Sequence, residues 1–280
     1  MDRRKQPLAH ASLFGPGALV RPFRCSVIVA HPADEVIGAG GLISKLKDVT
    51  VIHLTDGAPR NKRIVNEAGF EGSAAYAEAR RRECISALAL ANVPEDHVLE
   101  LDIGDHQAPQ FLAELSKRLT TLLQHSAPDV VLTHPYEGGH PDHDAAAFAT
   151  NAAVRLLKRH GFKPPVLFEM ALHPGRDGET RVLDFLPSSG RETTTLMLDE
   201  EAQELKRRMY ECFATQREAL KENPLGPERF RRPPLYDFTL PPQHGKLNYE
   251  NFDQEFTRQE WQFLARKAWI DLFPEETPGH

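Results

Sequence analysis

Short apolar runs alternate with longer amphipathic stretches from Cys25 to about Ala171. Short runs rich in Val and Ile are typical of buried strands, whereas apolar residues spaced three and four apart are typical of helices. The predicted strands are 25–30, 49–55, 97–101, 129–133 and 166–171. Successive parallel strands need a long crossover between them, usually a helix. The alternation therefore predicts an α/β fold with a Rossmann-like, mainly parallel sheet flanked by helices.

The segments between these strands carry helix signals. Ser73 can cap a helix over about 73–91, and Pro109 suits the first turn of a helix over 109–125 whose leucines share one face. Pro141 likewise suits the start of a helix that runs on to about Leu157. Each predicted helix is long enough to serve as a crossover.

The regular alternation of strand-like and helical stretches ends after Leu172. A Thr-rich strand is predicted at 193–198, and Asp199 can cap a helix over 200–221. The segment 223–247 contains six prolines, which predict extended segments and turns. Because this region also holds Phe230, Tyr236, Phe238 and Trp261, we expect it to pack back on the sheet.

With 280 residues, 40% of them hydrophobic, the chain can bury a large core. We predict an N-terminal extension over 1–24 and a single domain over 25–280. Within that domain, 25–171 is the motif core and 172–280 a C-terminal elaboration. The aromatic residues of the elaboration could cover the sheet or form an oligomer surface.

Several functional classes are disfavoured. The net charge of -6 comes from interspersed acids and bases without a long basic run, so nucleic acid is not expected as a partner. No stretch approaches the roughly 20 apolar residues of a membrane span, and no secretory segment precedes the first strand. We therefore expect a cytoplasmic location, in which the three cysteines stay reduced and buried.

Two clusters of potential metal ligands follow predicted strands. His31-Pro32-Ala33-Asp34-Glu35 comes after the first strand, and His140-Pro141-Asp142-His143 comes after the fourth. Open α/β sheets bind ligands at such strand ends. A hydrolytic zinc site needs about three protein ligands and one open position for water. The clusters favour one divalent ion with a free position. Read separately, each could be a polar loop whose histidines cap helices, but their shared placement argues against that.

The chain resembles the PIG-L (LmbE-like) zinc-dependent N-deacetylases. The motifs that carry the resemblance are the two clusters, Thr55-Asp56-Gly57-Ala58, and Arg80 with Glu83. They run in order through about residues 25–171, roughly half of the chain. A weaker similarity lies at Tyr236-Asp237-Phe238. The resemblance implies a Rossmann-like sheet and removal of an N-acetyl group from an amino sugar or glycoconjugate, such as one containing N-acetylglucosamine.

The resemblance also implies roles for individual residues. One Zn²⁺ per chain would be bound by His31, Asp34 and His143. His140 would stabilise the oxyanion or protonate the leaving amine. Arg80 and Asp105 would contact the substrate, the latter on a looser match. The expected partner is therefore a small N-acetylated sugar compound.

Ala33 departs from the family motif, which reads His-Pro-Asp-Asp-Glu. The first aspartate of that motif is the general base, and a methyl group cannot accept a proton. Positioned acid/base groups typically contribute about 10² to 10⁴ in rate, so we expect this chain to bind metal and substrate but to turn over slowly. Ala33 could be an introduced substitution or mark a member that retains only binding. It could also belong to a natural member that uses Glu35, His140 or Asp142 as its base.

Three other functions remain open at this point. The same site could cleave a larger amide, such as a thiol-sugar or acylated natural-product conjugate. It could instead bind a glycan through the metal without chemistry. A dinucleotide-binding oxidoreductase is suggested by Gly38-Ala39-Gly40-Gly41 alone, which lacks the Gly-x-Gly-x-x-Gly spacing. Those glycines more simply let the first helix pack closely on the sheet.

Overall fold

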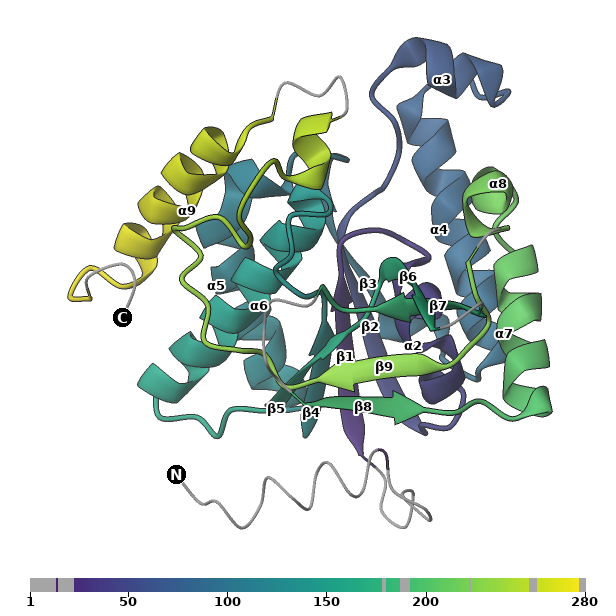
Figure 1. Ribbon diagram of the computed structural model, residues 1–280, viewed down its shortest axis with the longest axis horizontal. Helices are drawn as coiled ribbons and strands as arrows, with labels where there is room; N and C mark the ends of the chain where they lie inside the picture. The colour runs from purple at the N-terminus through teal and green to yellow at the C-terminus, as the bar shows by residue number, and fades with distance from the viewer. Residues whose placement is uncertain are drawn as a thin grey trace.

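A seven-stranded sheet runs through the protein in the order β3-β2-β1-β4-β5-β9-β8 (Figure 1). The computed structural model describes residue 14 and the ranges 23–177, 180–186, 192–221, 223–251 and 256–276. Most of the predicted extension 1–24 lies outside these residues, and the domain division stays a prediction.

Five parallel strands form the part of the sheet that precedes the C-terminal elaboration. They are β1 Arg24–Val29, β2 Asp48–Thr55, β3 Val98–Ile103, β4 Val130–Thr133 and β5 Val166–Met170. Their positions lie within a few residues of the predicted ones. The predicted α/β fold with a mainly parallel sheet is confirmed.

The C-terminal region adds two antiparallel strands to the β5 edge. β9, Glu228–Arg231, pairs with β5, and β8, Thr193–Leu196, pairs with β9. β6, His173–Asp177, and β7, Thr180–Asp184, form a separate hairpin. β8 was predicted, but β9 falls in the proline-rich segment for which the sequence predicted only extended chain and turns.

Helices cover both faces of the sheet. On one face lie α2 Asp34–Ile43, α4 Ser73–Leu90 and α7 Glu200–Glu211, and on the other α5 Leu112–Ser126, α6 Pro141–Arg159 and α9 Arg258–Leu272 (Figure 1). The short helices are α3 Lys62–Glu67 and α8 Arg217–Leu220. None of the helices within the described ranges is long and apolar enough to span a bilayer.

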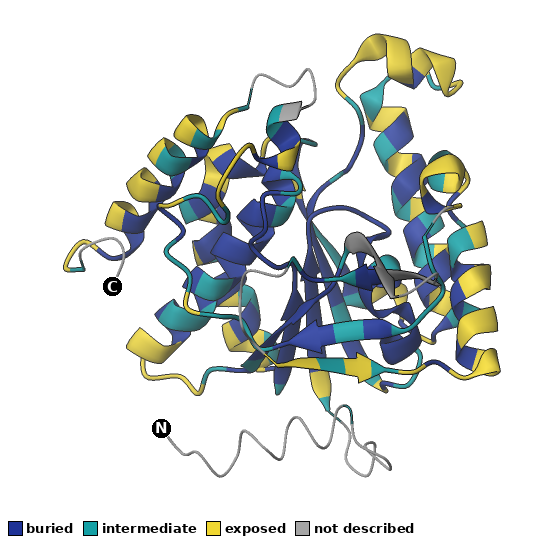
Figure 2. Ribbon diagram, in the orientation of Figure 1, coloured by how far each residue is buried: buried dark blue, intermediate teal, exposed yellow. Residues whose placement is uncertain are grey.

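Side chains of the central strands point alternately into two cores. In β1, Val27 packs with the α2, α4 and α7 side, while Ile28 packs with the α5, α6 and α9 side. Because β1 is buried on both faces, its sequence is an unbroken apolar run. Figure 2 shows the sheet buried throughout its centre, with exposure concentrated on the outer faces of the helices.

The helix predicted over 200–221 is interrupted. α7 ends at Glu211, and Phe213 has non-helical backbone angles (φ -90°, ψ 77°) and a fully buried ring. The chain then continues through a short 3₁₀ turn, Ala214–Gln216, into α8. The prediction of one continuous helix was wrong because burial of Phe213 outweighs the local helix preference of the surrounding residues.

The tail packs back on the sheet, as predicted. Trp261 of α9 is fully buried, and its indole N–H donates to the carbonyl oxygen of Phe238 at 3.0 Å. α9 itself begins with a capping box in which Thr257 and Glu260 each bond the other's backbone amide. This helix was not predicted, although the capping box was a usable signal.

The glycines after β1 serve packing. A Cβ at Gly38 would lie 2.7 Å from the sulfur of Met170 in β5, so α2 approaches the sheet closely there. Gly41 and Leu42 donate their amides to the buried Glu228 carboxylate at 2.7 and 2.9 Å. This segment is therefore a close-packed helix anchored to β9, as the packing interpretation predicted.

Candidate metal centre

The two ligand clusters meet at the carboxyl ends of neighbouring strands. Residues 31–35 follow β1, and residues 140–143 follow β4, its direct neighbour in the sheet. The strand order reverses between β1 and β4, and open α/β sheets bind ligands at such a point. The site therefore lies where the topology of the fold favours one.

The first cluster forms a tight turn with an unusual backbone. Ala33 has a positive φ of 98° directly before α2. Among residues other than glycine, Asn and Asp tolerate this region best, because their side chains bond locally. The turn also brings the Asp34 carboxylate back to accept the amide of His31 at 2.9 Å.

Asp34 is the common neighbour of the clustered histidines. Its Oδ2 atom lies 3.2 Å from Nδ1 of His31 and 3.4 Å from Nε2 of both His143 and His134. Donor atoms of His31, His140 and His143 also lie within 4.8 Å of one another. The structure thus brings the predicted ligands His31, Asp34 and His143 together at one place.

Burial and charge shape this cluster. Burial alone would raise the pKa of Asp34, but His143, His134 and His31 hold it well below its usual range. Burial lowers the pKa of His140, and the neighbouring His31 and His143 lower it further. A carboxylate among imidazoles is the mixed oxygen and nitrogen donor set that suits zinc.

His134 was not among the residues predicted to bind the metal or the substrate. It is fully buried, and its Nε2 accepts the Ala30 amide at 2.9 Å, with a pKa lowered to about 4 by burial. Its ring stacks on that of His143 at 4.1 Å. Because the Nε2 lone pair accepts the Ala30 amide, it is not free to bind a metal, and His134 supports the site through the stacking of its ring on His143.

Asp142 orients His31. Its Oδ2 lies 3.2 Å from His31 Nε2 and accepts the amide of His106 at 2.7 Å, while Oδ1 accepts the amide of Ala108 at 3.0 Å. Asp105 also approaches His31 Nε2, at 3.1 Å. A carboxylate behind a ligating histidine fixes the orientation of its ring.

Two of the three alternative bases named from the sequence face away from solvent. Glu35 is fully buried and accepts from Ala33 N at 3.1 Å, with His53 Nε2 also 3.1 Å away. Asp142 is fully buried as well. Of the three, His140 lines a cavity of the site.

The Arg80 side chain links the loop after β1 to the loop after β2. Its guanidinium donates to the carbonyl oxygens of Pro32 and Gly57, and its side chain lines the cavity beside Ala33. Gly57 has a positive φ of 58°, and a Cβ there would clash with the Arg80 guanidinium, so glycine is favoured at this position. Arg80 therefore positions the turn that carries Ala33, besides any contact with substrate.

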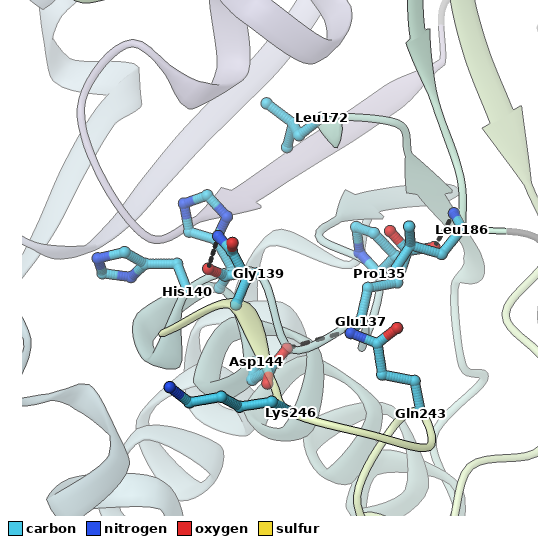
Figure 3. A pocket seen from close by; sticks show the side chains of 11 residues that line it. Pro135, Glu137, Gly139, His140, Asp144, Leu172, Leu186, Gln243 and Lys246 are labelled. Atoms are coloured by element: carbon cyan, nitrogen blue, oxygen red, sulfur yellow. Dashed lines mark hydrogen bonds between the residues drawn. The ribbon is translucent and has the colours of Figure 1, made fainter. Parts of the chain in front are cut away.

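Two cavities adjoin the cluster. The metal-side cavity, about 290 Å³, is lined by His31, Ala33, Asp34, Arg80 and Asp105 among others. The outer cavity, about 350 Å³, is lined by Glu137, Asp144, Leu172, Leu186 and Lys246 among others (Figure 3). His140 and His143 line both, so a ligand could extend from one cavity into the other.

Glu137, in the wall of the outer cavity, belongs to a buried ionic network. Arg231 of β9 lies 3.1 Å from Glu137 and 2.7 Å from Glu169 of β5, and the Tyr236 hydroxyl donates to Glu169 at 2.6 Å. Glu137 also accepts the amide of Leu186 at 2.9 Å. The sequence did not reveal this network, because its members are joined by the unpredicted strand β9.

Glu137 is expected to make stability depend on pH. Burial raises its pKa from 4.5 to about 7, although Arg231 opposes the shift. Between these values the folded protein holds a proton that the unfolded chain has lost, so the free energy of unfolding falls as pH rises. One such group contributes at most about 1.4 kcal/mol per pH unit. Urea unfolding measured between pH 4.5 and about 7 should show that the free energy of unfolding falls less steeply with pH in Glu137→Gln than in the unchanged chain. The exposed Glu218→Gln serves as control, and equal slopes in all three proteins would contradict the assignment.

Comparison with known proteins agrees with the geometry. Residues 26–154 match the family model PIG-L, described as GlcNAc-PI de-N-acetylase. Diacetylchitobiose deacetylase of Thermococcus kodakarensis is 34% identical over 135 residues, which cover 45% of this chain and 47% of that protein. The probable N-acetyl-alpha-D-glucosaminyl L-malate deacetylase 2 of Bacillus subtilis is 27% identical over 138 residues, covering 48% and 60%. The chain thus spans about half the length of these curated relatives.

A solved structure shares the fold. The A40926 pseudoaglycone deacetylase Dbv21 superposes with a TM-score of 0.59 at 20% identity, covering 76% of this chain and 97% of that one. At this identity the similarity establishes the α/β architecture. It extends past the matched segment 26–154 into the C-terminal half of the chain.

Proposed function

We propose that this chain, which carries a PIG-L family segment at residues 26–154, is a metal-dependent hydrolase that removes the N-acetyl group from an amino sugar or glycoconjugate. The observation that carries the proposal is the meeting of His31, Asp34 and His143 beside a cavity that can admit a substrate. The curated relatives, which are named as deacetylases of sugar conjugates, support the same reaction class.

One Zn²⁺ would be held by His31, Asp34 and His143. When bound, it would lower the pKa of a water molecule and polarise the acetyl carbonyl. The clustering of a low-pKa carboxylate with imidazoles supports this ligand set. Asp142 and Asp105 would hold the His31 ring in place through its other nitrogen.

His140 would act on the oxygen of the reacting amide. Its Nδ1 accepts the amide of Asp142 at 3.1 Å, which places the proton of the neutral ring on Nε2. Burial and the nearby histidines keep its pKa well below the usual range, so the ring is neutral near pH 7. A neutral N–H donor in a cavity wall suits stabilisation of an oxyanion.

Ala33 occupies the general-base position of the family motif. It lines the metal-side cavity beside Asp34, where its methyl group offers no proton acceptor. Arg80 and Asp105 line the same cavity, and we assign them to substrate contacts. The chain as written would therefore bind an N-acetylated sugar and hydrolyse it slowly.

The metal assignment is testable without turnover. Zinc analysis of the purified protein by mass spectrometry is expected to give about one ion per chain, and His143→Ala should lose most of it. The matched control is His125→Ala, because His125 lies exposed on α5, away from the cluster. Titration with N,N'-diacetylchitobiose should show binding that a chelator abolishes. Zinc retained by His143→Ala, or binding unchanged by the chelator, would refute the proposal.

A second candidate is a glycan-binding protein that uses the metal without chemistry. The observation in its favour is Ala33, since the family's base is missing at that position. A glycan-binding protein would have the same zinc content as the proposed hydrolase and would bind the same N-acetylated sugars. The two functions separate in the Ala33→Asp variant, in which a binding protein would gain no activity.

A further inference from the structure

We propose that Glu83 is a positioning residue that holds Gln216 in the lining of the metal-side cavity, where Gln216 accepts a hydrogen bond from a hydroxyl of the sugar. This inference rests on the proposed function and adds to it a contact from the C-terminal region. Glu83 carries part of the family resemblance, but it lines neither cavity of the site. Its role is therefore exerted through other residues.

The Glu83 carboxylate binds Thr215 with both of its oxygens. Oε1 accepts the amide of Thr215 at 3.0 Å, and Oε2 accepts its hydroxyl at 2.5 Å. Glu83 is half-buried on α4, whereas Thr215 lies in the 3₁₀ turn that follows α7. This pair of hydrogen bonds therefore ties the matched segment 26–154 to the C-terminal region.

The carbonyl oxygen of Thr215 in turn orients the Gln216 side chain. Gln216 Nε2 donates to that oxygen at 3.1 Å and to the Tyr76 hydroxyl at 2.9 Å. Tyr76 is buried on α4, and its hydroxyl donates to the same carbonyl oxygen at 3.2 Å. Because a carbonyl oxygen can only accept, it fixes which end of the Gln216 amide is the nitrogen. Both N–H groups of this amide are thus used within the protein.

The amide oxygen of Gln216 is left for a ligand. No hydrogen bond to this atom is made by any of the described residues. Because it is not one of the buried side-chain atoms that lack a partner, solvent reaches it. Gln216 lines the metal-side cavity together with His31, Asp34 and Arg80. A sugar offers hydroxyl donors, and an acceptor that is already fixed loses little side-chain entropy when it binds one.

The segment that carries Gln216 depends on this hold because little protein packs behind it. Residues 217–219 are exposed. Leu220 and Asn223 line the metal-side cavity and also a third cavity of about 610 Å³. The segment is therefore a thin partition between two cavities, and its bonds to Glu83 at Thr215 anchor it to α4.

One turn of α4 thus serves two parts of the site. Arg80 and Glu83 are three residues apart, so their side chains lie on the same face of the helix. Arg80 binds the turn that carries Ala33 through the Pro32 carbonyl oxygen, and Glu83 binds the segment that carries Gln216. The proposed metal ligands follow β1 and β4, so removal of the Glu83 carboxylate should leave them in place.

The test is calorimetric binding of N,N'-diacetylchitobiose to the zinc-loaded chain as written, whose slow turnover allows equilibrium measurement. Glu83→Met removes both acceptors and should weaken binding about fivefold to tenfold, roughly the contribution of one hydrogen bond, with the zinc content unchanged. Glu83→Gln should keep most of the affinity, because its amide can still accept the Thr215 amide and donate to the Thr215 hydroxyl. Glu78→Met, at an exposed glutamate of the same helix, is the matched control and should bind normally.

A double substitution distinguishes positioning of Gln216 from a general structural role. Gln216→Leu should weaken binding as much as Glu83→Met does. Adding Glu83→Met to Gln216→Leu should cause little further loss, because Glu83 acts through Gln216. Thr215→Val breaks the link without changing α4 and should also weaken binding, by about threefold, whereas Thr215→Ser keeps the hydroxyl and should bind normally.

Unchanged affinity in Glu83→Met would overturn the inference alone. So would losses in Glu83→Met and Gln216→Leu that multiply in the double variant, or a loss of zinc in Thr215→Val, in which α4 is intact. Failure of the unchanged, zinc-loaded chain to bind N,N'-diacetylchitobiose would overturn the proposed function with it.

Discussion

Replacing Ala33 with aspartate is expected to raise the rate of N-acetyl hydrolysis by about 10² to 10⁴. The aspartate would restore a proton acceptor on the wall of the metal-side cavity, next to Asp34. The backbone is suited to it, because φ at this position is 98° and aspartate tolerates that region better than alanine. Acetate release from N,N'-diacetylchitobiose at matched zinc, reported as kcat/KM, measures the gain.

Ala33→Asn is the matched control. Asparagine has nearly the same shape and the same tolerance of positive φ, but its amide does not act as a base. Both variants should therefore fold at least as stably as the unchanged chain, while only the aspartate variant gains activity. Equal rates for Asn and Asp would show that position 33 contributes shape alone. No gain on any amide, short or long in its acyl group, would favour the glycan-binding alternative.

Removing the charge of Lys206 is expected to destabilise the fold by about 3 to 5 kcal/mol. Lys206 of α7 and Glu228 of β9 are almost completely buried, and their charged atoms lie 2.8 Å apart. In Lys206→Met the Glu228 carboxylate would stay buried without its cation, although it would still accept the Gly41 and Leu42 amides. Urea unfolding followed by circular dichroism measures the loss.

An exposed pair provides the comparison. Lys117 and Asp271 also lie 2.8 Å apart, but their side chains are 57% and 53% exposed. Lys117→Met should cost less than about 1 kcal/mol, because water screens such pairs. A similarly small loss in Lys206→Met would contradict the prediction. Because Glu228 anchors α2, whose first residue is Asp34, we also expect the variant to bind zinc less tightly.

The central strands and the clustering of the proposed metal ligands were predictable because their signals are local. A strand buried on both faces, such as β1, must be apolar along its length, and His31 follows it directly. The parallel arrangement then places the ends of β1 and β4 at the same edge of the sheet. Two short motifs were therefore enough to predict that His31 and His143 meet.

The rest depends on contacts between residues far apart in the chain. β9 is four residues long and lies among several prolines, so pairing with β5 determines it more than its own composition does. The Arg231 network arises from that pairing. Phe213 shows a second effect of tertiary packing. The predicted helix ends before it because its ring is buried in the core.

The division of the proposed ligands between β1 and β4 links metal affinity to global stability. His31 and Asp34 are separated from His143 by more than a hundred residues, so an unfolded chain could not present them together. An ion held only by the native state stabilises that state by RT ln(1 + [metal]/Kd), about 2.7 kcal/mol when free metal is a hundred times Kd. Bound zinc would thus link β1 to β4 at the centre of the sheet and stabilise the folded state. The melting temperature would then rise with the fraction of the protein that has zinc bound.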